Sequence, residues 1–323
     1  MSLITPLSIP EAIAARRILV AGLLLLPLLD GCTLHRAAST LPPGVVPHAQ
    51  WEAAPPVGHA ADGTRRNLGA GERFEFRDLR VEVLDVVTDS ARVPPADAVR
   101  LRLTRAGDAI ERMVDEGTAF NWSGYHFAIV AVYGPGELGA GLAAIEVATI
   151  QSLPPSVAAS TSAGGAELRL RVPHDITHVT LHHSGSPEPL RPEDDVRAKL
   201  RGLQAWGARD RNWWDVPYHF LIDLEGRIYE GRDWHYLGET NTRYDPSGHF
   251  LISVVGNYDL QRPTAGQLAA IADLMAWAVQ RFDVPLDRIG GHYDYAETSC
   301  PGRHLRRYLE DGTLLHMVQA RLH

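Results

Sequence analysis

The sequence predicts two folded domains: a small all-β domain, followed by an α/β domain in which a mixed central β-sheet is covered by helices. Three observations lead to this prediction. Short segments between residues 69 and 152 alternate apolar and polar side chains, as half-buried strands do. Residues 152–165 are rich in Ser, Pro, Ala and Gly, a composition typical of a linker. Beyond them, apolar runs of strand length are interleaved with two helical stripes, which favours a sheet covered by helices.

Length and charge limit the classes of protein to which the chain can belong. It has 323 residues, of which 45% are hydrophobic, enough for two apolar cores. Its net charge is −8, from 31 Lys and Arg against 39 Asp and Glu, and no strongly basic patch stands out. Because nucleic-acid binding depends on basic surfaces that neutralise phosphates, we expect no nucleic-acid partner.

Residues 1–32 have the pattern of an export signal. An arginine pair precedes the apolar run 18–29, whose 12 residues are too few for a membrane span and suit a signal peptide. The run ends in a segment that resembles a bacterial lipoprotein processing box and places Cys32 at the lipidated position. We therefore expect an exported, periplasmic protein that a lipid on Cys32 anchors to a membrane. An ordinary cleaved signal is the alternative, because Asp30 stands where a small residue is usual.

The all-β domain is predicted over residues 69–152, after a tether of residues 33–68 that is rich in Ala, Pro and Gly. Turn-forming pairs and triplets separate its candidate strands. Five strand-like segments are expected, at residues 74–76, 79–84, 99–103, 125–133 and 143–148. A sandwich or partial barrel accommodates them. No catalytic constellation is apparent in this domain.

The α/β domain is predicted over residues 167–323, after a linker at 153–166. Helices are expected from about residue 192, where acidic residues suit the positive end of the helix dipole, and along the stripe 268–282. The expected strands are residues 177–182, 218–222, 227–230 and 250–255. The second and third form a hairpin, and counting outward from a turn at 223–226 places His219 opposite Glu230.

The segment 291–302 (GHYDYAETSCPG) places a histidine and a cysteine within reach of one metal ion. Imidazole nitrogen and thiolate are a standard donor pair for zinc, and the strand ending at His182 and His183 can supply a second imidazole. Neighbours on a strand point to opposite faces, so only one of these two histidines readily reaches a single metal. Three protein ligands would leave a fourth position for water, as in a metallohydrolase.

Four motifs in a fixed order then carry a resemblance: 180–184 (TLHHS), 213–220 (WWDVPYHF), 225–232 (EGRIYEGR) and 291–302. Over about residues 170–315 the chain resembles the zinc N-acetylmuramoyl-L-alanine amidases, the superfamily shared by phage-lysozyme-type amidases and peptidoglycan recognition proteins. The all-β domain lies outside this resemblance.

The resemblance implies a set of site residues and a cofactor. His182, His292 and Cys300 match the zinc ligands, with His183 in the variable position that follows. Tyr218 matches a tyrosine that catalytic members carry near the metal. Because a free phenol has a pKa of ~10, we expect it to donate a hydrogen bond to an oxyanion and not to act as a base. Thr298 matches a second catalytic position, where other members have lysine or threonine.

The activity implied is hydrolysis of the amide between N-acetylmuramic acid and the L-alanine of a peptidoglycan stem peptide (a muropeptide substrate), with Zn²⁺ activating a water molecule. A non-catalytic peptidoglycan-binding lipoprotein is the alternative. Members without activity often have serine where this chain has Cys300, so Cys300 together with Tyr218 favours the enzyme. A cysteine nucleophile is disfavoured because orienting partners are missing from the segment. The all-β domain could separately act as a wall- or partner-binding module.

Overall fold

The computed structural model describes residues 59–89, 96–134, 141–153, 170–211 and 213–322. All of these belong to one compact unit, residues 38–323. The expected export signal at residues 1–32 and nearly all of the expected linker at 153–166 lie outside the described residues, so both stay predictions. Within the described residues, no helix is both long and apolar enough to cross a membrane.

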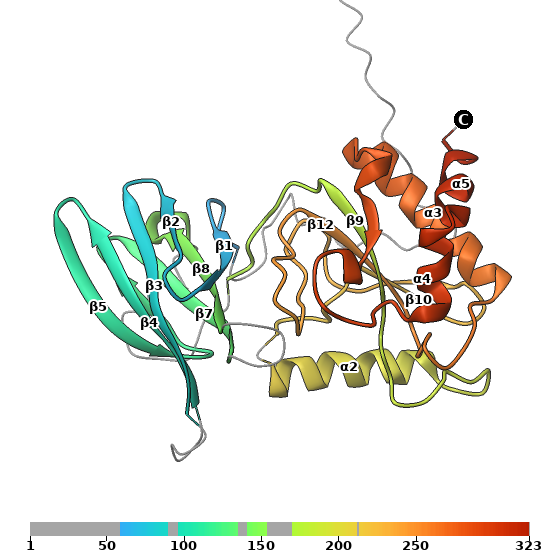
Figure 1. The fold of residues 1–323 in the computed structure, drawn as a ribbon, viewed down its shortest axis with the longest axis horizontal. Coiled ribbons are helices and arrows are strands. Elements are labelled where there is room, and N and C mark those ends of the chain that lie inside the picture. Colours follow the sequence, from blue (N-terminus) through green and yellow to red (C-terminus); the bar gives the residue numbers. More distant parts are fainter. Residues whose placement is uncertain (1–58, 90–95, 135–140, 154–169, 212, 323) are drawn as a thin grey trace, which may run out of the picture. The chain divides into compact units, whose positions relative to one another are not determined.

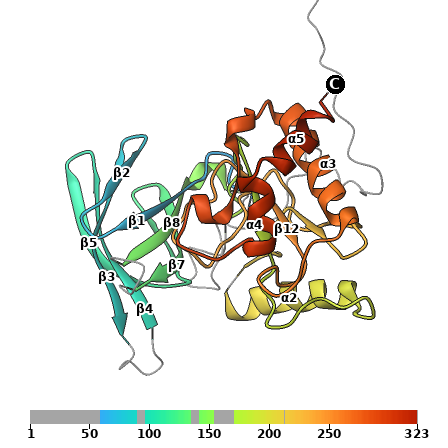
Figure 2. The ribbon, with the colours of Figure 1, turned by 45° about the vertical axis from the view of Figure 1, so that its right-hand side comes forward.

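The first part of the described chain is a β-sandwich, which we define as strands β1 to β8 (Figures 1 and 2). One antiparallel sheet has the order β1-β8-β7-β6, and the other has the order β2-β3-β4-β5. The strands are β1 (Thr64–Gly69), β2 (Arg73–Phe76), β3 (Leu79–Asp89), β4 (Ala96–Arg105), β5 (Asp108–Asp115), β6 (Ala119–Trp122), β7 (Tyr125–Tyr133) and β8 (Leu142–Thr149). The predicted all-β region is therefore present, and it is a sandwich.

Alternation of side chains explains how the two sheets pack. In β4, Val99, Leu101 and Leu103 are fully buried, while Arg100 and Arg102 between them are exposed. The inward side chains of both sheets form a single apolar cluster. The β4–β5 hairpin turns at Ala106 and Gly107, whose φ angles of 51° and 92° match the type I′ turn that suits two-residue hairpin loops.

The prediction of a tether over residues 33–68 is wrong at its C-terminal end. Strand β1 begins at Thr64 and pairs antiparallel with β8, and residue Arg65 lies opposite Glu146. The segment Thr64–Gly69 has the sequence TRRNLG, which offers a single large apolar residue and hence no visible alternation. It forms a strand because β8 supplies the partner, a long-range contact that local pattern does not reveal.

The second part of the described chain has a central sheet of order β11-β10-β12-β9-β13. Strands β10, β12, β9 and β13 run parallel, and β11 pairs antiparallel with β10, so the sheet is mixed as predicted. The strands are β9 (His178–His183), β10 (Phe220–Ile222), β11 (Ile228–Glu230), β12 (His249–Val254) and β13 (Ile289–Gly291). The helices are α2 (Val196–Asp210), α3 (Ala265–Phe282), α4 (Arg303–Glu310) and α5 (Thr313–Gln319), with the short 3₁₀ segments η2 (Leu286–Arg288) and η3 (His292–Asp294). A further 3₁₀ segment, η1 (Ile150–Ser152), directly follows β8 of the sandwich.

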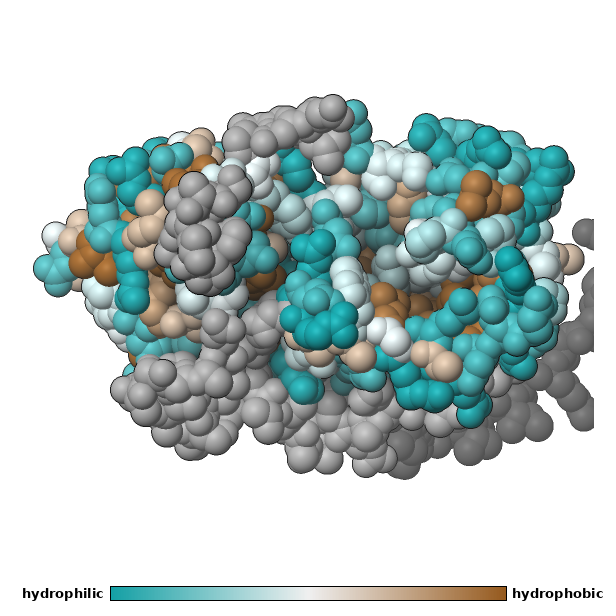
Figure 3. All heavy atoms as spheres, turned by 90° about the horizontal axis from the view of Figure 1, so that it is seen from below, coloured by the Kyte–Doolittle hydropathy of each residue, from teal (hydrophilic) through white to brown (hydrophobic). Residues whose placement is uncertain are grey.

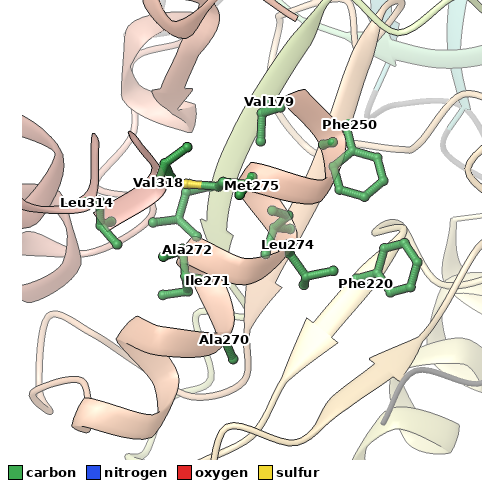
Figure 4. Packing of buried hydrophobic residues seen from close by; sticks show 14 of the residues in the cluster. Val179, Phe220, Phe250, Ala270, Ile271, Ala272, Leu274, Met275, Leu314 and Val318 are labelled. Carbon is green, nitrogen blue, oxygen red and sulfur yellow. The ribbon is translucent and has the colours of Figure 1, made fainter. Parts of the chain in front are cut away.

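Helix α3 covers one face of this sheet. It begins with a capping box, in which the Thr264 hydroxyl accepts from the Gln267 N–H and the Gln267 side chain accepts from the Thr264 N–H. Its apolar stripe packs on alternate residues of the strands, among them Phe220 and Phe250 (Figure 4). Leu314 of α5 belongs to the same cluster. This helix carries the predicted stripe 268–282, and the stripe is core.

Helix α2 covers part of the opposite face. Asp195 caps it by accepting a hydrogen bond from the Ala198 N–H at 3.0 Å. Val196 packs with Leu221, which points away from the α3 side because its neighbours in β10 point toward α3. The sheet therefore has an apolar face under α3, whereas its other face is shared between α2 and the polar side chains described below.

The hairpin register predicted from the sequence is wrong by one residue. Phe220, not His219, pairs with Glu230, because the connecting loop is longer than the turn assumed. His219 is completely buried, where its Nε2 lies 3.0 Å from the Tyr236 carbonyl oxygen and its Nδ1 accepts the Leu251 N–H at 2.9 Å. Backbone groups therefore fix this imidazole.

On the face seen in Figure 3, hydrophilic side chains cover most of the described surface, and hydrophobic ones gather in small separate patches. Met113 and Leu260 are the large hydrophobic side chains that stand exposed among the described residues. Scattered exposure of this kind is ordinary for a folded domain.

Candidate metal centre

Strand β9 separates an apolar face from a polar one. Val179 and Leu181 point into the core beneath α3. His178, Thr180 and His182 alternate with them and therefore point to the other side of the sheet. His182 lies near the carboxyl end of the strand and is 1% exposed. In a sheet of parallel strands, this is the edge at which functional side chains collect.

The pairing of β13 with β9 brings His292 to this position. The two strands are parallel and Gly291, the last residue of β13, pairs with Leu181. The residue that follows each of them is a histidine, His182 within β9 and His292 at the start of η3. The rings of His182 and His292 lie with their centroids 4.6 Å apart. A separation of 110 residues in sequence is therefore closed by the register of two short parallel strands.

Cys300 completes the cluster from a turn after η3. Its Sγ lies 3.7 Å from His182 Nδ1 and accepts a hydrogen bond from the His183 N–H at 3.4 Å. Gly302 allows this turn, since its φ is +89° and an added Cβ would lie 2.5 Å from the Tyr258 carbonyl carbon. Any larger residue at position 302 would force either this turn or the backbone at Tyr258 to shift.

The three side chains fit a zinc ion. One donor atom from each of His182, His292 and Cys300 lies within 4.8 Å of the other two, and all three residues are buried. Ligand bonds of about 2.0–2.3 Å arranged as a tetrahedron separate the donor atoms by about 3.4–3.7 Å. The distance of 3.7 Å between Cys300 Sγ and His182 Nδ1 agrees with this spacing. Two imidazoles and a thiol are also the donors that zinc prefers.

Burial sets the protonation of these groups. It lowers the pKa of His182 well below its ordinary value and that of His292 to about 4, so both imidazoles are neutral and can act as ligands. Burial also raises the pKa of the Cys300 thiol to about 12. A nearby metal cation reverses this last effect, because a coordinating thiol is deprotonated.

The structure places Tyr218 beside the cluster. Its ring centroid lies 5.2 Å from that of His182, and its hydroxyl donates to the His183 carbonyl oxygen at 3.4 Å. Burial, and next the neighbouring Cys300, raise the pKa of this phenol above its ordinary value. Tyr218 therefore keeps its proton at neutral pH and is available as a hydrogen-bond donor.

Thr298 is half-buried and lies in the turn that carries Cys300. Its hydroxyl oxygen accepts a hydrogen bond from the Cys300 N–H at 3.2 Å. The contact holds the backbone of the turn, and it uses the oxygen as an acceptor. The structure thus gives Thr298 a supporting contact with the Cys300 turn, and its catalytic role stays a prediction.

The other histidines considered have different surroundings. His183 Nδ1 accepts the Tyr258 N–H at 3.1 Å, so this imidazole is engaged away from the cluster. His178 stacks on His249 with centroids 4.7 Å apart. His174 and His235 belong to a cavity of about 530 Å³ near the start of β9, and its lining includes none of the three candidate ligands.

Two residues near the metal centre had no signal in the sequence. Thr242 Oγ1 lies 2.6 Å from His292 Nε2, and the Tyr244 hydroxyl lies 3.4 Å from His182 Nε2. Both belong to residues 238–248, which we call the site loop and which precede β12. The loop has neither helical nor strand periodicity, and nothing in its spacing connects it to residues 182 or 292.

Comparison with known proteins gives a consistent result. A family model described as Amidase_2, N-acetylmuramoyl-L-alanine amidase, matches residues 172–303. Peptidoglycan recognition protein 1 of Bos taurus is 33% identical over 144 residues, which cover 44% of this chain and 74% of that protein. Peptidoglycan-recognition protein SC2 of Drosophila melanogaster is 34% identical over 131 residues, covering 40% of this chain and 70% of that protein.

Two further matches are a longer curated relative and a solved structure. The N-acetylmuramoyl-L-alanine amidase of Homo sapiens is 31% identical over 127 residues, and the match covers 38% of this chain but 22% of that protein. The chain thus spans less than a quarter of the length of that amidase. The solved structure of Manduca sexta Peptidoglycan Recognition Protein-1 aligns with 42% of this chain and 77% of its own, at 29% identity and a TM-score of 0.38. Through residues 172–303, the chain belongs to the family of N-acetylmuramoyl-L-alanine amidases and peptidoglycan recognition proteins.

Proposed function

We propose that the chain is a zinc-dependent N-acetylmuramoyl-L-alanine amidase. Its reaction would add water across the amide between the lactyl group of N-acetylmuramic acid and the stem peptide. The C–N bond breaks, the lactyl group becomes a carboxylate, and the peptide leaves with a free L-alanine amino terminus. The observation that carries the proposal is the buried group of His182, His292 and Cys300 with the Tyr218 phenol beside it.

His182, His292 and Cys300 would hold the zinc ion. When bound, zinc supplies an activated water as nucleophile and polarises the substrate carbonyl. Tyr218 would donate its hydroxyl proton in a hydrogen bond to the carbonyl oxygen as that oxygen gains negative charge. Loss of one such donor typically raises the barrier by about 3 kcal/mol, or roughly 100-fold to 1000-fold in rate. Thr298 would hold the Cys300 turn and could add a second donor.

Product analysis tests the reaction. The chain lacking residues 1–32 is incubated with purified peptidoglycan, and the soluble products are identified by mass. We expect free stem peptides that begin with L-alanine. Products of glycan cleavage, or of cleavage between amino acids, would show that the assigned reaction is wrong.

A Cys300→Ser variant tests the metal centre. We expect loss of bound zinc and of stem-peptide release together, because a serine hydroxyl is a poor ligand for zinc. Ser299→Ala is the matched control, since that neighbouring side chain bonds to Asp259 and not to the cluster. Full activity of Cys300→Ser in metal-depleted buffer would exclude the zinc mechanism.

A non-catalytic peptidoglycan-binding protein is the second candidate. The same digestion distinguishes it, because that protein would sediment with peptidoglycan while releasing no stem peptide. We also propose that residues 1–32 direct export to the periplasm and that Cys32 carries the lipid anchor. Labelling with a radioactive fatty acid, with Cys32→Ser as the control, tests the anchor directly.

A further inference from the structure

Two hydroxyl groups of the site loop contact the candidate imidazole ligands on the nitrogen that does not face the cluster. His182 directs Nδ1 toward Cys300 Sγ, so its Nε2 is the nitrogen left for Tyr244. His292 has its Nε2 engaged by Thr242, which leaves Nδ1 to face the cluster. When each imidazole is neutral and its Nδ1 lone pair is free for a metal, the proton is on Nε2. Each Nε2–H then donates a hydrogen bond to a hydroxyl oxygen of the loop. Partners of this kind fix the ring orientation and the tautomer of metal-binding histidines.

The opposite side of the site loop is bonded to the β-sandwich. The Asn67 side-chain amide in β1 donates to two loop carbonyl oxygens, those of Arg243 at 3.1 Å and Tyr244 at 3.0 Å. The Tyr133 hydroxyl at the end of β7 donates to the Thr240 carbonyl oxygen at 2.9 Å. These bonds reach the backbone on both sides of Thr242. The loop conformation that presents Thr242 and Tyr244 is therefore specified by residues more than 100 positions away.

Buried charges fix the start of the loop. Arg65 of β1 bonds to Glu239 at 2.8 Å and to Glu146 of β8 at 2.7 Å, and all three side chains are at most 3% exposed. Arg232 pairs with the same Glu239 at 3.2 Å. Because a buried charge without its partner is costly, the loop is held where Glu239 can meet both arginines.

We propose that the β-sandwich is a positioning element for the metal centre: it clamps the site loop so that Thr242 and Tyr244 orient the imidazoles of His292 and His182. The proposal deepens the proposed function, since it rests on the metal site of that function. A loop without regular structure loses conformational entropy when it is ordered, and bonds from a rigid strand offset that loss in advance. A sandwich that only bound the cell wall would need no contact with the loop backbone.

Zinc affinity is the readout, measured by competition with a chromophoric chelator on the folded protein lacking residues 1–32. Thr242→Val removes the hydroxyl that contacts His292, and we expect zinc affinity to fall about 10-fold to 100-fold. Thr242→Ser, which keeps the hydroxyl, should restore most of it. Tyr244→Phe should have a smaller effect, because its contact with His182 at 3.4 Å is longer than a usual hydrogen bond.

The decisive variants lie in the β-sandwich. Asn67→Ala and Tyr133→Phe each remove bonds to the site loop, and we expect each to weaken zinc binding by about 2-fold to 10-fold. Tyr125→Phe is the matched control, because it removes a phenol of the same strand that bonds to Asp78 within the sandwich. If zinc affinity is unchanged in both Asn67→Ala and Tyr133→Phe while Thr242→Val weakens it, the proposed clamp is wrong.

Combined variants separate positioning from general stability. If Asn67 acts through Thr242, Asn67→Ala should weaken zinc binding less in the Thr242→Val background than in the wild type. Additive losses would show that the sandwich acts by another route and would overturn the proposal. Zinc affinity also separates this proposal from the amidase assignment. If zinc binding depends on Asn67 as expected but the wild-type protein releases no stem peptide, the positioning role of the β-sandwich is supported and the amidase assignment is wrong.

Discussion

The inward faces of the two sheets of the β-sandwich are alike, whereas their outward faces differ in how far they are buried. Both contribute alternate apolar residues to one shared core. On the outward face of the β1-β8-β7-β6 sheet, Glu146 and Arg65 are 1% and 3% exposed. On the outward face of the other sheet, Arg102 pairs across the strands with Glu82 and Glu111, and its side chain is 44% exposed. The first sheet is covered on both sides, whereas the second meets solvent on one.

The difference shows that the contribution of a cross-strand ion pair to stability depends on its burial. Exposed pairs gain little, because water screens the attraction and two long side chains must be ordered. Removing one partner of a buried pair is strongly destabilising, because the other partner is left as an uncompensated charge in a medium of low dielectric constant. In the described residues, Arg65 belongs to a chain of contacts from Glu146 through Glu239 to Arg232. The buried outward face is thus the side that contacts the site loop.

The largest expected effect follows from breaking the buried pairs. Arg65→Met keeps most of the side-chain volume but leaves Glu146 without this partner, and we expect it to lower the free energy of unfolding by about 3–5 kcal/mol. Urea denaturation measures the change, and Arg66→Ala, at an exposed neighbour in β1, is the control. A loss below about 1 kcal/mol would mean that the outward face is not buried in solution.

The inward faces should respond equally in the two sheets. Leu101 in β4 and Ile145 in β8 are both completely buried in the shared core. We expect Leu101→Ala and Ile145→Ala each to cost about 2–5 kcal/mol, because each leaves a cavity and loses apolar burial. Thermal or urea unfolding of both variants tests this. A large loss for one and almost none for the other would contradict a single shared core.

Replacing both members of the buried pair should cost less than replacing one. In Arg65→Met combined with Glu146→Leu, no carboxylate is left alone at position 146, and Glu239 retains Arg232. We expect a loss of about 1–2 kcal/mol relative to the wild type, smaller than for Arg65→Met alone. The comparison of single and double variants by urea denaturation measures it. If the double variant is the less stable one, the loss in Arg65→Met comes from packing and not from charge.

Local pattern was sufficient for several elements with one apolar face, but it did not give β5 and β6, which contribute Val114 and Phe120 to the shared core. The alternation at Val99–Leu103 and the stripe of α3 gave both the elements and their buried sides. The candidate ligands His182, His292 and Cys300 came instead from the resemblance that four motifs carry, and the structure brings these three side chains together. The strand and helix signals are each contained within a few neighbouring residues, whereas the ligand assignment needs motifs spread over residues 180–302.

What the sequence could not provide depends on contacts between distant segments. Strand β1 forms because β8 is its partner, and the position of His219 depends on the length of the turn after β10. Thr242 and Tyr244 lie in a loop whose shape is set by Asn67 and Tyr133. Such contacts produce no periodic pattern in the sequence. Strand β8 is buried on both faces, and its sequence has a glutamate, Glu146, between apolar residues. The ion pair of this glutamate with Arg65 explains it, and that contact cannot be read from the strand itself.

The smallest effect is expected on the solvent side of the sandwich. Arg102→Ala should lower the free energy of unfolding by less than about 1 kcal/mol, although it removes contacts with both Glu82 and Glu111. In 1 M salt, where the screening length is about 3 Å, this loss should largely disappear. The loss in Arg65→Met should persist in the same salt, because ions do not enter the buried face. Urea denaturation of both variants at low and high salt measures this contrast, and a loss in Arg65→Met that also disappears in salt would place its ion pairs in contact with solvent.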